Sequence, residues 1–210
     1  MDWIILVLYI LIAYLFGSIP TGYILVKQLK GIDIRTVGSG GTGATNVKRV
    51  MGTKYFVIVM LCDMFKGMIP TLAALHSGLM PDILPSQYTL AIIVGIAAVF
   101  GHSKSIFINF TGGKSVATSI GVLLAMCWQT ALIAFIIWVI VVYLTRYVSL
   151  GSIIASFSTP ITMWLFDQPA SFVIFTLICS LYVSLYLHRA NIKRLFAGTE
   201  NKFSLKGEAK

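Results

Sequence analysis

Three short polar segments interrupt an otherwise apolar chain, and their residue types are those that bind phosphate. They are GSGGTGATNVKR at residues 38–49, GGKS at residues 112–115 and HRANIKRL at residues 188–195. Glycine-rich turns let backbone N–H groups converge on an anion, while helix N-termini, lysine and arginine supply positive charge. The segments therefore predict binding sites for phosphorylated molecules.

Two well-known phosphate motifs match these segments by letter but fail in context. Gly38, Gly40 and Gly43 have the G-x-G-x-x-G spacing, but no strand precedes them as a dinucleotide site requires. The GGKS segment ends like a P-loop, yet the position five residues before Gly113 holds Ile108 instead of glycine. The chain also has no G-x-S-x-G nucleophile elbow. Dinucleotide, P-loop and serine-hydrolase chemistry are therefore not expected.

The elements that position these segments are long apolar stretches. The chain has 210 residues, of which 58% are hydrophobic and 11% charged. Apolar stretches of about 15 to 25 residues exceed what a globular core helix needs and match a bilayer span. The sequence therefore predicts an all-α integral membrane protein. The spans are expected near residues 3–26, 55–78, 88–100, 116–145, 150–166 and 171–187.

The stretch over residues 116–145 is too long for one crossing. As a single helix it would measure about 45 Å at 1.5 Å per residue, whereas a bilayer core is about 30 Å thick. We expect a helical hairpin that turns near Trp128 and Gln129, with one long tilted helix as the alternative.

The positive charges decide between these two topologies. With the hairpin, the opposite loops hold only Asp2, Asp82 and Asp167, whereas a single helix would move everything from Arg146 onward to the other side. The positive-inside rule therefore predicts a compact bundle of seven transmembrane helices, with the N-terminus outside and the C-terminus in the cytoplasm. Every Lys and Arg except Lys66 then lies on the cytoplasmic side, namely Lys27, Lys30, Arg35, Lys48, Arg49, Lys54, Lys104, Lys114, Arg146, Arg189, Lys193, Arg194, Lys202, Lys206 and Lys210.

Composition also limits the domains and partners. We expect residues 1–199 to form one transmembrane domain and residues 200–210 a polar cytoplasmic tail. The net charge of +9 is explained by topology and by attraction to anionic lipid, so the expected partner is the bilayer and not nucleic acid. The cysteines lack metal-ligand spacing and are expected to be packing residues, so no metal or cofactor is predicted; they are Cys62, Cys127 and Cys179.

Two ionisable residues lie inside the second predicted span. An unpaired charge at the bilayer centre costs about 2.5–3.5 kcal/mol, and Asp63 and Lys66 are three residues apart, within one helical turn. We expect a structural ion pair, with a catalytic role as the alternative. His102, just after the third predicted span, is expected to anchor a loop.

The three polar segments, in this order, resemble the motifs of the bacterial acyl-phosphate:glycerol-3-phosphate acyltransferase family. The similarity extends to GSIPTG at residues 17–22, DMFKG at residues 63–67 and RYVSLGSI at residues 146–153. Membership implies a multi-pass enzyme of the bacterial inner membrane whose active site faces the cytoplasm. It implies transfer of a fatty acyl group from acyl phosphate to the sn-1 hydroxyl of glycerol 3-phosphate, which gives lysophosphatidic acid and phosphate in phospholipid biosynthesis. A soluble enzyme that forms acyl phosphate would be a transient partner.

The resemblance also implies roles for individual residues. The expected catalytic residues are Ser39, Arg49, Lys114, His188 and Asn191. Small donors and one ammonium make a compact site for the acyl-phosphate group, at Ser39, Thr45, Asn46, Gly112, Gly113 and Lys114. Glycerol 3-phosphate is expected to bind Arg49, Lys114, Ser152, His188 and Asn191.

Two questions stay open at this point. His188 has the pKa range of a general base, but the leaving phosphate is the favoured proton acceptor. The chain also departs from the family pattern, with Gly41 where Asn is usual and Ser115 where Gly is usual. The alternative function, a transporter or channel for a phosphorylated metabolite, would also gather cations and glycine breaks, but such sites usually lie near the bilayer midplane.

Overall fold

The computed structural model describes residues 2–203, and these residues form helices and turns with a single isolated bridge between Ser105 and Thr111. Lys206, Lys210 and most of the expected tail lie outside the described residues. The chain divides into two compact units, residues 2–126 and 127–203, which are described separately.

The described part has five helical segments that are long and apolar enough to cross a membrane, and the all-α membrane class is thereby confirmed. Two shorter apolar helices accompany them, Gln87–Ser103 and Val116–Met126. The five long segments are Asp2–Lys30, Thr53–His76, Trp128–Thr145, Val148–Leu165 and Ala170–Leu187.

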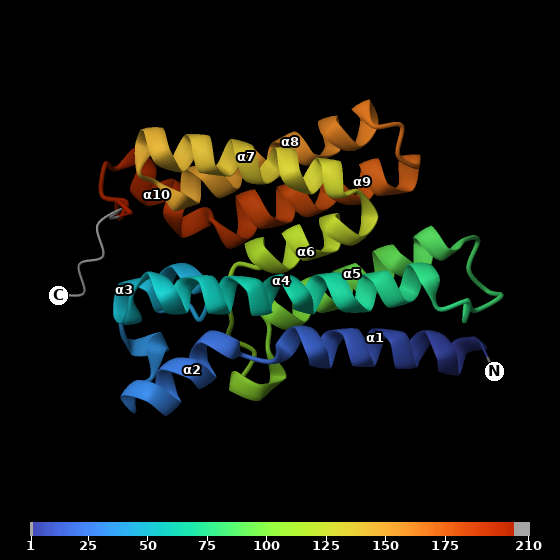
Figure 1. The fold of residues 1–210 in the computed structure, drawn as a ribbon, viewed down its shortest axis with the longest axis horizontal. Helices are drawn as coiled ribbons and strands as arrows, with labels where there is room; N and C mark the ends of the chain where they lie inside the picture. The colour runs from blue at the N-terminus through green and yellow to red at the C-terminus, as the bar shows by residue number, and fades with distance from the viewer. Residues whose placement is uncertain (1, 204–210) are drawn as a thin grey trace. The chain divides into compact units, whose positions relative to one another are not determined.

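The first unit is built around α4, which packs against α5 and α6, while α1 packs along α5 (Figure 1). Glycines let the backbones of α4 and α6 approach closely, because Gly67 lies on the backbone of Thr118 and Gly121 on that of Met64. The elements of this unit are α1 (Asp2–Ser18), α2 (Thr21–Lys30), η1 (Ile34–Thr36), α3 (Ala44–Met51), α4 (Thr53–His76), α5 (Gln87–Ser103), η2 (Ile106–Ile108) and α6 (Val116–Met126).

The first predicted span is broken in the structure. α1 ends at Ser18 and α2 begins at Thr21, on either side of Pro20, which has no N–H to continue the helix. The carbonyl oxygens freed by this break accept hydrogen bonds from side chains. Ser105 Oγ donates to the carbonyl of Ser18 at 2.5 Å, and Lys66 Nζ donates to the carbonyl of Ile19 at 2.6 Å. Neighbouring elements thus satisfy the break, as a backbone within a membrane requires.

The second unit is a layer of long helices in which α8 packs against α7 and α9 (Figure 1). Its elements are α7 (Trp128–Thr145), α8 (Val148–Leu165), α9 (Ala170–Leu181), the π-helix η3 (Tyr182–Leu187) and α10 (Arg189–Phe196). The apolar stretch over residues 116–145 is two helices, α6 and α7, because the backbone is extended at Cys127 (φ −158°, ψ 97°). The expectation that this stretch is not one long helix is confirmed.

Candidate active site

The first polar segment forms a loop, residues 38–43, that leads into α3, and the side chain of Asn46 holds this loop from inside. Asn46 is 2% exposed, and its Oδ1 accepts a hydrogen bond from the backbone N–H of Ser39 at 2.9 Å. Its Nδ2 donates to three carbonyl oxygens, those of Ile34 at 3.2 Å, Val37 at 3.0 Å and Gly41 at 2.9 Å. The side-chain amide of Asn46 is therefore already hydrogen-bonded to backbone groups in and before the loop.

This loop and α3 together carry exposed hydroxyl and guanidinium groups. Gly38 and Gly40 have positive φ angles of 61° and 70°, which favour glycine and let the chain turn sharply. Ser39 and Arg49 are exposed, and Thr45 lies four residues before Arg49 on the same face of α3. The N-terminus of α3 adds the positive end of its dipole at this loop. The loop and α3 thus offer the donors that a phosphate group needs.

A small hydrophobic core fixes α3 beneath the loop. Val26, Ile34, Val47 and Val59 are fully buried and bring together α2, η1, α3 and α4. Lys48, half-buried on α3, has its pKa lowered by that burial. The residues of α3 that are expected to bind phosphate thus belong to a packed helix.

The second polar segment is hydrogen-bonded to, and closely packed against, the C-terminal end of α5. The N–H of Gly113 donates to the carbonyl of His102 at 3.1 Å. An added Cβ at Gly113 would overlap the His102 ring, and one at Gly112 would overlap the backbone of Ser103. Both glycines are therefore required by close packing, and the expected anchoring role of His102 is confirmed. Lys114 follows, half-buried, just before α6 begins.

The two departures from the family pattern have different structural consequences. Ser115 has a φ of 57°, a left-handed conformation that costs a non-glycine residue about 1–2 kcal/mol. Its Oγ donates to the carbonyl of Val99 at 2.8 Å, which offsets about 0.5–1.5 kcal/mol of that cost. At Gly41 an added Cβ would meet only Ser39 Oγ at 3.8 Å, so a side chain has room there.

A side-chain contact links η1 and η2, the short helices that precede the two polar segments of the first unit. Arg35, in η1 just before the first loop, donates to the carbonyl of Ile108 in η2 at 3.4 Å. The same guanidinium pairs with Asp33 at 2.6 Å, and this hydrogen-bonded pair lowers the pKa of the Asp33 carboxyl. The first unit carries seven of the expected site residues, and this contact joins the short helices that precede its two polar segments; the seven are Ser39, Thr45, Asn46, Arg49, Gly112, Gly113 and Lys114.

In the second unit, His188 follows the π-helix and is 2% exposed. Its Nδ1 lies 2.8 Å from the carbonyl oxygen of Val183. A carbonyl can only accept, so Nδ1 carries the hydrogen and the neutral ring has its lone pair on Nε2. Short π-helical turns often occur at functional sites, and the sequence pattern gave no sign of this one.

Glu200 organises the rest of the second-unit site. Its carboxylate accepts hydrogen bonds from Asn191 Nδ2 at 2.6 Å, Ser149 Oγ at 2.9 Å and Arg194 Nε at 2.7 Å. Burial alone would raise the pKa of Glu200, but these hydrogen bonds together hold its pKa below the ordinary value of 4.5. Glu200 thus ties Asn191 of α10 to the first turn of α8, where the buried Ser152 also lies.

Glu200 was missed as a site residue by the sequence reasoning, which placed it at the start of a polar tail. The signal was its position just after the third polar segment, twelve residues after His188. In the second unit Glu200 therefore joins Asn191 of α10 to the N-terminal end of α8, which also carries Ser152, and His188 directly precedes α10.

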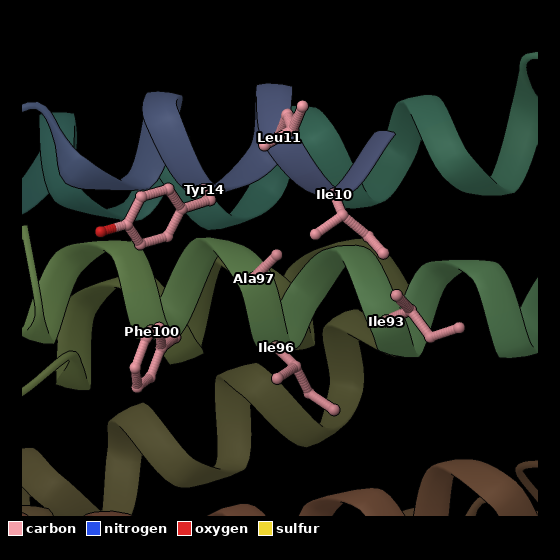
Figure 2. A pocket seen from close by; sticks show the side chains of 7 residues that line it. All are labelled: Ile10, Leu11, Tyr14, Ile93, Ile96, Ala97 and Phe100. Atoms are coloured by element: carbon pink, nitrogen blue, oxygen red, sulfur yellow. The ribbon is translucent and has the colours of Figure 1, made fainter. Parts of the chain in front are cut away.

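An apolar hollow in the first unit lies between α1 and α5 (Figure 2). It measures about 320 Å³ and is lined by Ile10, Leu11, Tyr14, Ile93, Ile96, Ala97 and Phe100. The Tyr14 hydroxyl donates to the carbonyl of Lys104 at 2.8 Å. The hollow therefore offers no charged partner for phosphate, and the candidate site remains at the polar loops.

The fold and loops define a helical membrane protein whose glycine-rich and basic segments are suited to phosphorylated molecules. The chain belongs to the glycerol-3-phosphate acyltransferase family, whose model matches residues 7–198. A glycerol-3-phosphate acyltransferase of Nostoc sp. is 49% identical over 207 residues, covering 94% of this chain and 91% of the relative. A glycerol-3-phosphate acyltransferase of Acholeplasma laidlawii is 40% identical over 224 residues, covering 97% of this chain and 94% of the relative.

Two solved structures are also similar. Both are crystal structures of PlsY (YgiH), an integral membrane glycerol 3-phosphate acyltransferase, and both are 38% identical to this chain. The glycerol 3-phosphate form gives a TM-score of 0.86 and covers 95% of this chain and 96% of that chain. The lysophosphatidic acid form gives a TM-score of 0.84 and covers 95% of each.

Proposed function

We propose that this protein transfers a fatty acyl group from acyl phosphate to the sn-1 hydroxyl of glycerol 3-phosphate, giving lysophosphatidic acid and phosphate. The observation that carries the proposal is the construction of the two first-unit segments. Gly38, Gly112 and Gly113 are closely packed and Asn46 holds the first loop, so the protein itself holds in place the backbone that carries the donors. Preorganised donors are what a reaction driven by positioning and charge stabilisation requires.

The proposed roles follow the two units. In the first unit, Ser39, Thr45, Gly112, Gly113 and Lys114 contact the acyl-phosphate group, and Asn46 contributes by shaping the loop. Arg49 offers a bidentate fork to the phosphate of glycerol 3-phosphate, with Lys114 as a second cation. In the second unit, the residues that bind glycerol 3-phosphate are Ser152, His188 and Asn191, with Glu200 holding Asn191.

The reaction needs no acyl-enzyme, because an acyl phosphate is already activated. The glycerol hydroxyl oxygen attacks the acyl carbonyl carbon, the bond between that carbon and the phosphate oxygen breaks, and phosphate leaves. In our proposal the leaving phosphate accepts the hydroxyl proton, while His188 binds glycerol 3-phosphate through Nε2, which can accept a hydrogen bond. The position of the His188 lone pair on Nε2 makes base catalysis by this residue the alternative to test.

We also propose that seven helices cross the bilayer, with the N-terminus outside and the site facing the cytoplasm of the inner membrane. In this proposal α5 and α6 cross the bilayer in addition to the five long apolar segments, and the three polar segments then lie on one side with the basic loops. Cysteines introduced at the exposed Thr36 and Lys202 should be labelled from the cytoplasm, and ones at Asp82 and Asp167 from outside. Labelling of Lys202→Cys from outside would contradict this topology.

A proteoliposome assay tests the proposed activity. Purified protein is supplied with acyl phosphate in the bilayer and labelled glycerol 3-phosphate in solution. We expect labelled lysophosphatidic acid to form without uptake of label into the vesicle lumen. Uptake of glycerol 3-phosphate without lipid product would instead identify a transporter.

A further inference from the structure

Three ionisable side chains of α4 and α5 are buried together in the first unit, and the proposed mechanism assigns no role to them. Asp63 and Lys66 of α4 are 2% and 3% exposed, and His102 of α5 is 9% exposed. Lys66 Nζ lies 2.5 Å from Asp63 Oδ1, which confirms the predicted pair, and His102 Nδ1 lies 3.7 Å from the same carboxylate oxygen. Buried charges in a membrane span are costly and usually mark function.

One end of this cluster holds the break in the first span. Lys66 Nζ donates to the carbonyl of Ile19 at 2.6 Å, beside Pro20. The neighbouring carbonyl, that of Ser18, is held by Ser105 Oγ at 2.5 Å, and Ser105 belongs to the segment that leads to the GGK loop. The break between α1 and α2 is thus held by Lys66 of α4 and by Ser105, which precedes the second polar segment.

The other end of the cluster holds the GGK loop itself. His102 contacts Gly113 in two ways, since its carbonyl accepts the Gly113 N–H at 3.1 Å and its ring lies where a Cβ of Gly113 would be. The position of the ring therefore sets the position of Gly113 and of Lys114 after it. The Asp63 carboxylate, which contacts both Lys66 and the His102 ring, joins the two ends.

We propose that Asp63, Lys66 and His102 form a positioning network that fixes the Gly112–Lys114 loop for the phosphate group of the acyl donor. The proposal rests on the proposed function, because that function assigns the loop to acyl phosphate. The three residues act through Gly113 and do not touch the substrate. A buried ion pair that only braces the helices would affect stability, and it would not affect one substrate more than the other.

The test uses a double variant that removes both charges and keeps the volume, Asp63→Leu/Lys66→Met. Replacing a buried pair by apolar residues often leaves stability unchanged or higher, so the variant is expected to fold. With the full chain in detergent micelles, we expect KM for acyl phosphate to rise about tenfold and KM for glycerol 3-phosphate to change less than about twofold. His102→Ala leaves the ion pair intact and is expected to raise KM for acyl phosphate as well. If the double variant does not fold, the result for His102→Ala tests the positioning role instead.

Two controls separate the possible failures. Thr71→Val removes a buried hydroxyl from the same helix, where Thr71 Oγ donates to the carbonyl of Gly67 at 2.7 Å, and should leave both KM values unchanged. The network variants could raise both KM values equally, or raise neither, while Lys114→Ala still raises KM for acyl phosphate. Either result would show that the network has no positioning role. An unchanged KM for acyl phosphate in Lys114→Ala would overturn the proposed function of the loop and this inference with it.

Discussion

Replacement of Glu200 by glutamine is expected to destabilise the second unit and loosen the site residue Asn191. Glu200 is 9% exposed and accepts from Asn191, Ser149 and Arg194. A hydrogen bond to a charged group contributes about 1.5–3 kcal/mol, and the partly exposed Arg194 pair contributes less than about 1 kcal/mol. Glutamine keeps one oxygen that can still accept one of the buried bonds. The net loss is then about 2–4 kcal/mol, the sum of one charge-assisted bond and the Arg194 pair.

Thermal unfolding in detergent micelles measures this loss. For a chain of this size, 1 kcal/mol corresponds to about 2–4 °C in Tm, so Glu200→Gln should lower Tm by about 4–16 °C. Arg194→Gln is the matched control, because it removes one donor to the same carboxylate and should lower Tm by less than about 4 °C. Equal shifts for the two variants, or no shift for Glu200→Gln, would refute the assignment of Glu200 as the organiser of this site.

The pH dependence gives an independent check on the same group. The pKa of Glu200 is lowered in the folded protein, so its stabilising contribution is fully present above the ordinary value of 4.5. That contribution is lost as the pH falls below 4.5 through the folded pKa. The difference in Tm between wild type and Glu200→Gln should therefore shrink as the pH is lowered from neutrality to below 4.5.

Three further predictions concern the polar segments. Arg49→Ala and Lys114→Ala should each remove a phosphate contact worth about 1.5–3 kcal/mol and lower the initial rate about tenfold to a hundredfold, with circular dichroism unchanged; a rate within twofold of wild type would remove the residue from the site. His188→Gln should keep substantial turnover if the leaving phosphate takes the proton, whereas near-complete loss with unchanged glycerol 3-phosphate binding by calorimetry would identify His188 as the general base. Ser115→Ala should lower Tm more than Ser115→Gly, because both lose the bond to Val99 but only glycine relieves the left-handed backbone; the reverse order would contradict the strain argument.

The apolar spans and the break within residues 116–145 could be predicted because they depend on local composition, whereas the break of the first span at Pro20 was not predicted. The length of the apolar stretch over residues 116–145 already required a break, and the structure has one at Cys127. The pairing of Asp63 with Lys66 followed from their spacing on one helix. Each of these features is determined by residues that are close together in the sequence.

The features that could not be predicted depend on contacts between distant segments. Asn46 has the residue type of a phosphate ligand, yet its amide binds carbonyls up to twelve residues away, and only the loop conformation reveals this. Glu200 contacts Ser149 across 51 residues, and no periodic pattern marks such a contact. The assigned substrate contacts of Ser39, Thr45 and Ser152 stay predictions, because they depend on where the substrates bind.

The identity of the acyl donor tests the central claim most directly. Purified protein is supplied with glycerol 3-phosphate and, in separate reactions, with acyl phosphate, acyl-CoA or acyl-carrier protein, and lysophosphatidic acid is measured. The glycine-lined loop and Lys114 are proposed to hold the donor's phosphate, so we predict turnover with acyl phosphate only. Equal rates with a thioester donor would contradict the account.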